Sequence, residues 1–141
     1  MSLYFRAIGE PIPQGSMKGY VRAGRVALTS DNPRLHSWRD VIGWEARKHV
    51  TDLIDYPVSI ELGFILTRPK SVSKKRRPFP SVKPDNDKLI RAACDAMTGV
   101  VWKDDALVIT IASWKRYAED GEQPGVSVLV REFSGVFADD D

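Results

Sequence analysis

Residues 85–99 read DNDKLIRAACDAMTG, a stretch in which a helical pattern and several carboxylates coincide. Leu89, Ala93 and Met97 recur every four residues, and this spacing predicts the buried face of a helix from Asp87 to Met97. The aspartate or asparagine just before the helix can cap it, and the glycine after its last turn can end it. The stretch therefore predicts a short amphipathic helix with charged residues on its other side.

Acids gather at and around this helix. Asp87, Arg91 and Asp95 are spaced four apart, so they share one helix face. Asp85 stands at the helix N-terminus, and the pair Asp104-Asp105 comes just before an expected strand. Because a strand end and a helix start can meet in a folded domain, we expect one or both of the paired acids to lie beside Asp85 and Asp87.

Carboxylate oxygens suit Mg²⁺, which also keeps several waters of its own. In phosphodiester hydrolysis, such a metal activates a water and neutralises charge on the scissile phosphate. Arg91 could stabilise the charge that develops in the transition state. A plain structural interpretation competes with this one. Asp85 would then be only a helix cap, Asp87 and Arg91 a surface ion pair worth about 0.2–0.5 kcal/mol, and Asp104-Asp105 a solvated turn.

A basic segment, Thr67 to Pro84, precedes the acids. It contains four prolines and six lysines or arginines before Lys83, with almost no periodicity, which predicts a long mobile loop. A positive surface beside carboxylates suggests an enzyme that brings a nucleic-acid backbone to a metal. The residues expected to contact DNA are Lys18, Lys74, Lys75, Arg76, Arg77, Lys83 and Lys88.

The rest of the chain predicts an α+β fold, with a mixed or mostly antiparallel sheet of four to six strands and two main helices packed on it. The expected elements are a strand at Leu3–Ile8, a small hairpin at Tyr20–Arg22 and Arg25–Leu28, a helix at Pro33–Val50, a half-buried strand at Val58–Leu66, and a second hairpin of strands Ala106–Trp114 and Gly125–Arg131. Leu35, Trp38, Ile42 and Ala46 form the apolar stripe of the first helix. The tryptophans Trp38, Trp44, Trp102 and Trp114 are expected to pack in the interior rather than stack on bases.

Composition limits the class of protein. The chain has 141 residues, 43% of them hydrophobic, which fits one domain over residues 1–141. Its net charge is +2, so a nucleic-acid footprint must come from the placement of charge. The lone Cys94 excludes an internal disulfide and suits a reducing cytoplasm. We expect no membrane span, and an acidic, disordered tail at 135–141.

The run Lys83-Pro84-Asp85-Asn86-Asp87-Lys88-Leu89 resembles the RusA family of Holliday-junction resolvases, which carry K-P-D-x-D-N-L-x-K. Two further family motifs follow in order and with similar spacing. The first is Asp95-Ala96-Met97-Thr98-Gly99, and the second is Asp104-Asp105 followed by Val108. The segment Pro11 to Ser16 and the pair Trp38-Arg39 also resemble phage-type members. The likeness spans most of the chain and is far more specific than a D-x-D pair alone.

The resemblance implies a Mg²⁺-dependent homodimeric endonuclease that cuts four-way DNA junctions, with Mn²⁺ as an expected substitute and no small-molecule substrate. It implies that Asp85, Asp87 and Asp105 ligate the metal, and that Asp104 supports or ligates it. Two departures stand out. Lys88 replaces the family asparagine, and Arg91 stands at the family's functional lysine. Arginine keeps the charge and can clamp a phosphate, but it is too basic to donate a proton readily.

Two other functions compete with junction resolution. A metal-dependent nuclease that prefers forks, flaps or other branched DNA would use the same acids. A non-catalytic nucleic-acid-binding protein would use them only to cap and solvate. The likeness to phage-type members predicts a phage or prophage protein that acts in a bacterial cytoplasm during recombination or repair.

Overall fold

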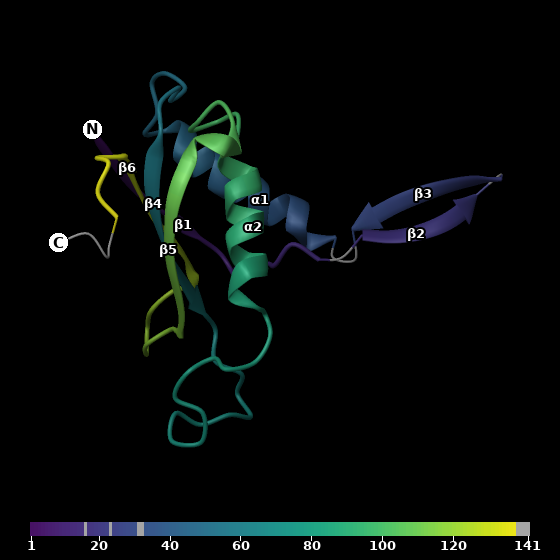
Figure 1. The fold of residues 1–141 in the computed structure, drawn as a ribbon. Helices are drawn as coiled ribbons and strands as arrows, with labels where there is room; N and C mark the ends of the chain where they lie inside the picture. Colours follow the sequence, from purple (N-terminus) through teal and green to yellow (C-terminus); the bar gives the residue numbers. More distant parts are fainter. Residues whose placement is uncertain (16, 23, 31–32, 138–141) are drawn as a thin grey trace.

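The computed structural model describes residues 1–15, 17–22, 24–30 and 33–137, and it has an α+β fold (Figure 1). One mixed four-stranded sheet carries two helices on one face, and a separate two-stranded hairpin extends from this body (Figure 1). The elements are β1 (Ser2–Ile8), β2 (Met17–Arg22), β3 (Arg25–Ser30), α1 (Arg34–Arg47), β4 (Val58–Leu66), α2 (Asn86–Met97), the 3-10 turn η1 (Asp105–Leu107), β5 (Val108–Tyr117) and β6 (Gly125–Glu132).

The sheet order is β1-β6-β4-β5, which corrects one prediction. β5 and β6 do not form a hairpin; β4 lies between them, parallel to β5 and antiparallel to β6. A parallel pair needs a crossover connection, and α2 supplies it between β4 and β5. β6 then returns to the far side of β4, where Gly125 lets it lie against the Ala7 carbonyl of β1, because a Cβ at that glycine would overlap the carbonyl.

The core lies between the helices and the sheet. Both predicted helical stripes are buried, including Leu35 and Ile42 on α1 and Leu89 and Met97 on α2. They pack on alternate residues of the central strands, and no described residue buries a polar or charged side chain in this core. Helix α1 contacts β1, whereas α2 lies beside β5. The two helices therefore divide one face of the sheet between them, and α2 is the helix nearest the β5 edge.

Three expectations about buried residues were wrong. Trp44 is 62% exposed because it lies about 200° around α1 from the buried Ile42. Trp114 is 49% exposed, because it lies on the sheet face that the helices leave open, where its ring covers Gly63. β4 is not half-buried: Gly63 and Ile65, on its second face, are buried as well. In addition, α1 ends at Arg47 rather than Val50.

No helix within the described residues is long and apolar enough to cross a membrane. The expected acidic tail falls largely outside the described residues, which end at 137.

Candidate active site

Two carboxylates stand free at the start of α2. Asp85 occupies the N-cap position in an extended conformation, and its backbone carbonyl accepts hydrogen bonds from the N–H groups of Lys88 and Leu89. Its carboxylate makes no capping hydrogen bond, and Asp87 is exposed in the first turn. Among the described residues, neither carboxylate has a hydrogen-bond or ion-pair partner, and Arg91 has none either. The cap and the surface ion pair of the plain structural interpretation are therefore not formed.

Strand β5 fixes the turn that leads into α2. The Lys115 Nζ donates hydrogen bonds of 2.9 Å to the carbonyl oxygens of both Val82 and Pro84. Two residues earlier on the same strand face, the Ser113 Oγ donates to the Asn86 Oδ1 at 2.9 Å. These contacts place the first turn of α2 against the C-terminal half of β5. Sequence reasoning missed them, because a lysine that binds backbone carbonyls leaves no recognisable spacing.

Arg68 organises the basic segment from within. Its guanidinium donates to the carbonyl oxygens of Ser73, at 3.3 Å, and of Pro78, at 3.4 Å, and also to that of Arg77. The same guanidinium lies 4.3 Å from the ring centroid of Tyr117 at the end of β5. The segment has no helix or strand, as predicted, but it follows a course defined by these contacts. Its mobility stays a prediction.

Four of the seven side chains expected to bind DNA are exposed. Lys74, Lys75 and Arg76 are exposed. The segment 67–84, which carries them, lies at the end of the molecule where α2 begins (Figure 1). Arg77 is half-buried, and Lys83 is exposed. Lys18 belongs to β2, where its side chain lies outside the described part of the structure. The structure thus brings the basic segment to the same end of the molecule as Asp85 and Asp87.

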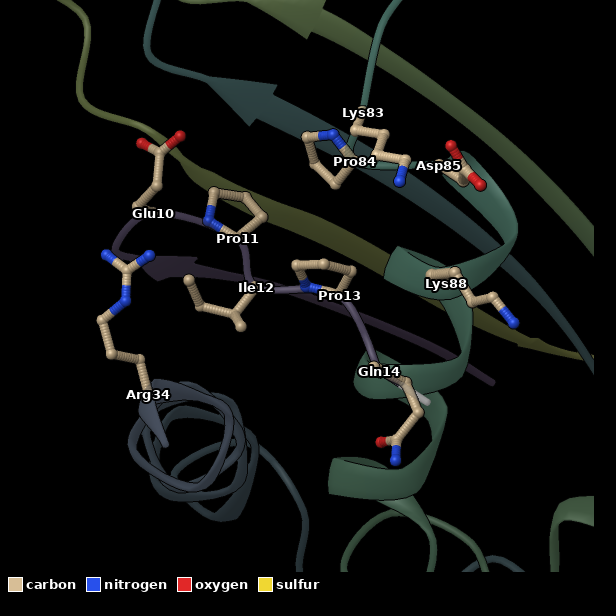
Figure 2. Close-up of a pocket in the computed structure, with 11 residues that line it drawn as sticks. Glu10, Pro11, Ile12, Pro13, Gln14, Arg34, Lys83, Pro84, Asp85 and Lys88 are labelled. Carbon is tan, nitrogen blue, oxygen red and sulfur yellow. The ribbon is translucent and has the colours of Figure 1, made fainter. Parts of the chain in front are cut away.

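A cavity of about 530 Å³ adjoins Asp85 (Figure 2). Residues 10–15, which leave β1, run through the middle of its lining, with Arg34 of α1 on one side and Lys83, Pro84, Asp85 and Lys88 on the other. The Gln14 N–H donates to the Lys88 carbonyl oxygen at 3.0 Å, which holds the segment across the first turns of α2.

Asp95 forms an ion pair between the two helices. Arg39 on α1 donates to the Asp95 Oδ2 at 3.4 Å and to the Gln14 Oε1. This bridge joins α1, α2 and the segment that leaves β1. Asp95 shares a helix face with Asp87, as predicted, but its partner is Arg39.

The pair Asp104-Asp105 lies at the other end of α2. The Asp104 Oδ1 accepts a hydrogen bond of 2.9 Å from the Ala106 N–H and caps η1. This bond, together with a side-chain hydrogen bond with Asp105, holds the pKa of Asp104 below its usual value. Asp105 is exposed and lies near Cys94: burial raises the pKa of Cys94 to about 11, and the charges of Asp95 and Asp105 contribute to the shift.

The predicted meeting of the acids in one copy is wrong. Among the described residues, no group of three histidine, cysteine, aspartate or glutamate side chains could hold a metal ion. The reason is the crossover. A helix that joins two parallel strands runs opposite to both, so α2 begins beside the end of β5, not beside its start. Asp87 is separated from Cys94, the neighbour of Asp105, by about 10 Å along the helix.

The comparison with known families decides the class of protein. The model of the endodeoxyribonuclease RusA family matches residues 9–131, which include all the acids and basic residues of the candidate site. The chain belongs to the RusA family. It is also 30% identical, over 140 residues, to the uncharacterized protein YqaN of Bacillus subtilis strain 168; the alignment covers 92% of this chain and 96% of that protein.

The RusA family is a family of endodeoxyribonucleases, so the match supports nuclease activity for this chain. Two residues of the candidate site, Lys88 and Arg91, depart from the family pattern. In this RusA chain, Lys88 is half-buried on the cavity wall beside Asp85, whereas Arg91 is exposed one helical turn further from the start of α2. Both cations are therefore near the free carboxylates. Lys88 adds a positive charge where the family pattern has an asparagine, whereas Arg91 keeps the charge of the family lysine.

Proposed function

We propose that this RusA-family chain is a metal-dependent endonuclease that resolves four-way DNA junctions by paired, symmetric nicks. The observation that carries the proposal is the free pair Asp85 and Asp87, which has no partner among the described residues and lies at the same end of the molecule as the exposed basic segment. Carboxylates left without a partner beside a cationic surface suit a metal that faces a phosphate.

The active site needs a second copy of the chain. β5 is an edge strand with a free outer side, and Ile109 and Ile111 on it are 43% and 46% exposed. A two-fold contact that pairs two β5 edges antiparallel continues the sheet and covers these isoleucines. Because α2 runs opposite to β5, the same contact brings Asp104-Asp105 of one copy level with the α2 start of the other. Each site then combines Asp85 and Asp87 with the acidic pair of the second copy.

Mg²⁺ is the proposed metal, and Mn²⁺ would substitute for it. When bound, it would supply an activated water and neutralise charge on the phosphate. Asp85, Asp87 and Asp105 would hold it, and Asp104, whose carboxylate already caps η1, would support Asp105. Arg91 keeps the positive charge of the family lysine and would clamp a phosphate oxygen rather than donate a proton.

The basic side chains would bind phosphates, which position DNA without reading its sequence. Lys74, Lys75, Arg76, Arg77, Lys83 and Lys88 would lie along the arms of the junction, and Lys18 of the hairpin is a further candidate. A four-way junction has approximate two-fold symmetry, which a two-fold dimer matches. The two sites of the dimer would then nick opposed strands. A phage or prophage origin, and action in a bacterial cytoplasm during recombination or repair, stay predictions.

The deciding experiment is cleavage of a synthetic four-way junction with Mg²⁺ or with EDTA, by the wild type and by Asp87→Asn. We expect paired symmetric nicks that need Mg²⁺ and disappear in the variant, while junction binding and the circular dichroism spectrum are kept. A single nick at forks or flaps with intact junctions would favour the branched-DNA nuclease. Binding without cleavage of any substrate would leave a non-catalytic DNA-binding protein and refute the proposal.

A further inference from the structure

The ammonium group of Lys115 donates its hydrogen bonds to backbone carbonyl oxygens, and it forms no ion pair with a carboxylate of the described residues. The side chain is half-buried on the α2 side of β5, and its Nζ donates to the carbonyl oxygens of Val82 and Pro84 at 2.9 Å each. Lys83, which lies between these two residues in the chain, is exposed and has no partner among the described residues. Lys115 therefore holds the backbone near Asp85, whereas the ammonium group of Lys83 stays available to a ligand.

The bonded carbonyls belong to the residues that set the direction of the chain as it enters α2. Val82 and Pro84 come just before Asp85, and Ser113 holds Asn86 directly after it. Two residues on one face of β5 thus hold three alternate residues around Asp85. The carboxylate of Asp85 makes no capping bond, so the backbone that these contacts fix is what sets its position relative to Asp87.

We propose that Lys115 is a positioning residue that holds the start of α2 so that Asp85 and Asp87 face one bound metal ion. This inference rests on the proposed function. Groups that hold the ligands of a metal ion in position without touching the ion typically contribute about 10- to 100-fold to metal affinity or activity. Lys115 acts through the backbone, so its loss weakens metal use and leaves DNA affinity nearly unchanged.

The test compares Lys115→Met with Lys115→Arg and with Lys48→Met. Methionine keeps the aliphatic chain and removes the donors, whereas arginine restores several donors at similar reach. Lys48 is exposed at the end of α1, so its replacement makes the same chemical change away from the site. Four quantities are measured for each full-length variant: the junction cleavage rate, the Mg²⁺ concentration at half-maximal rate, the junction affinity in EDTA, and hydrogen–deuterium exchange of the amides at residues 82–89.

We expect Lys115→Met to raise the half-saturating Mg²⁺ concentration, or lower the cleavage rate, by about 10- to 100-fold, with junction affinity within about 3-fold of the wild type. Exchange should rise at the Lys88 and Leu89 amides, which donate to the Asp85 carbonyl. Lys115→Arg should recover most of the rate and the slow exchange, and Lys48→Met should match the wild type. The proposal is overturned by unchanged exchange and Mg²⁺ response in Lys115→Met, by loss of binding equal to the loss of cleavage, or by no recovery in Lys115→Arg.

Failure of the proposed function would look different. If the wild type cuts no DNA, the nuclease proposal fails, and the exchange measurement alone still decides whether Lys115 holds the start of α2. If Lys115→Met does not fold, Ser113→Ala removes the neighbouring bond to Asn86 at little risk to the fold. It should shift exchange and Mg²⁺ response in the same direction, and no shift would overturn the proposal.

Discussion

The exposed cations of the basic segment allow a quantitative prediction about DNA binding. Lys74, Lys75 and Arg76 are exposed, whereas Arg77 is half-buried and its carbonyl is bound by Arg68. We therefore expect the first three side chains to make the phosphate contacts of this segment. Replacing all three with glutamine should keep the fold, because the contacts of Arg68 that define the segment involve the backbone and Tyr117.

Each phosphate contact to duplex DNA contributes about 0.9 to the slope of log K against log salt concentration. Three contacts in each copy therefore predict a slope that is shallower by about 2.7 in the triple variant. Between about 50 and about 200 mM salt, this difference amounts to about 40-fold in affinity per copy of the protein. A dimer on one junction would double the change in slope to about 5.4.

The assay is a fluorescence anisotropy titration of a labelled junction in EDTA at four or more salt concentrations. A matched control replaces three exposed cations with glutamine: Arg47 and Lys48 at the C-terminal end of α1, and Arg131 of β6. The control should keep the wild-type slope, because Arg131 pairs with Ser59 near the start of β4, at the opposite end from the basic segment. A triple variant with the wild-type slope would refute the phosphate contacts, and an equal change in the control would show only an effect of net charge.

Three further predictions follow from other contacts. Gly63→Ala should lower the free energy of unfolding by about 1–3 kcal/mol in urea titrations, since the new Cβ overlaps the ring of Trp114, and by less when Trp114 is alanine. Glu122→Gln should lower the melting temperature near neutral pH. Arg116 lowers the pKa of Glu122 from 4.5 to about 2, so the stability that the carboxylate contributes is present above pH 4.5 and is lost as the pH falls toward 2. Ile111→Lys should convert the proposed dimer to monomers in sedimentation runs and abolish the proposed Mg²⁺-dependent cleavage, because a charge on the β5 edge opposes pairing.

Each of these results has an outcome that would contradict it. If Gly63→Ala lowers the free energy of unfolding equally with tryptophan and with alanine at position 114, the new Cβ does not overlap the Trp114 ring. A Glu122→Gln difference that persists at pH 2 would show that the Arg116 ion pair is not its source. Tyr4→Lys, on the opposite edge strand β1, serves as the control for Ile111→Lys and should keep the wild-type assembly. If it also separates the copies, β5 is not the specific edge.

The helices could be predicted from the sequence because their signals are local. The stripes at Leu35 to Ala46 and at Leu89 to Met97 repeat at helical spacing, and both are buried. Strand pairing is a non-local property. β5 and β6 are neighbours in the chain and read as a hairpin, yet the parallel pairing with β4 leaves β6 on the far side. The RusA-like motif also identified the acids from the sequence. Their separation within one copy could not be predicted, because it depends on the direction in which α2 crosses the sheet.

Contacts between a side chain and a distant carbonyl were beyond sequence reasoning. Lys115 and Arg68 look like ordinary surface cations in the sequence, and neither lies at a spacing that predicts its partners. The same holds for Arg39, which pairs with Asp95 across 56 residues of the chain. The sequence shows that a side chain is charged. Which group it contacts depends on how the helices and strands pack against one another.

The position of β6 has a consequence for the order in which the protein folds. This strand is the last of the sheet along the chain, yet it lies in the interior of the sheet between β1 and β4 and pairs residues as distant as Ser2 and Arg131. Pairings between such distant residues form slowly. A nascent chain that has not yet released residues 125–132 from the ribosome leaves β1 and β4 without their shared partner. The sheet that carries α2 and its carboxylates therefore closes only after residues 125–132 have left the ribosome, so α2 is synthesised well before the sheet beneath it is complete.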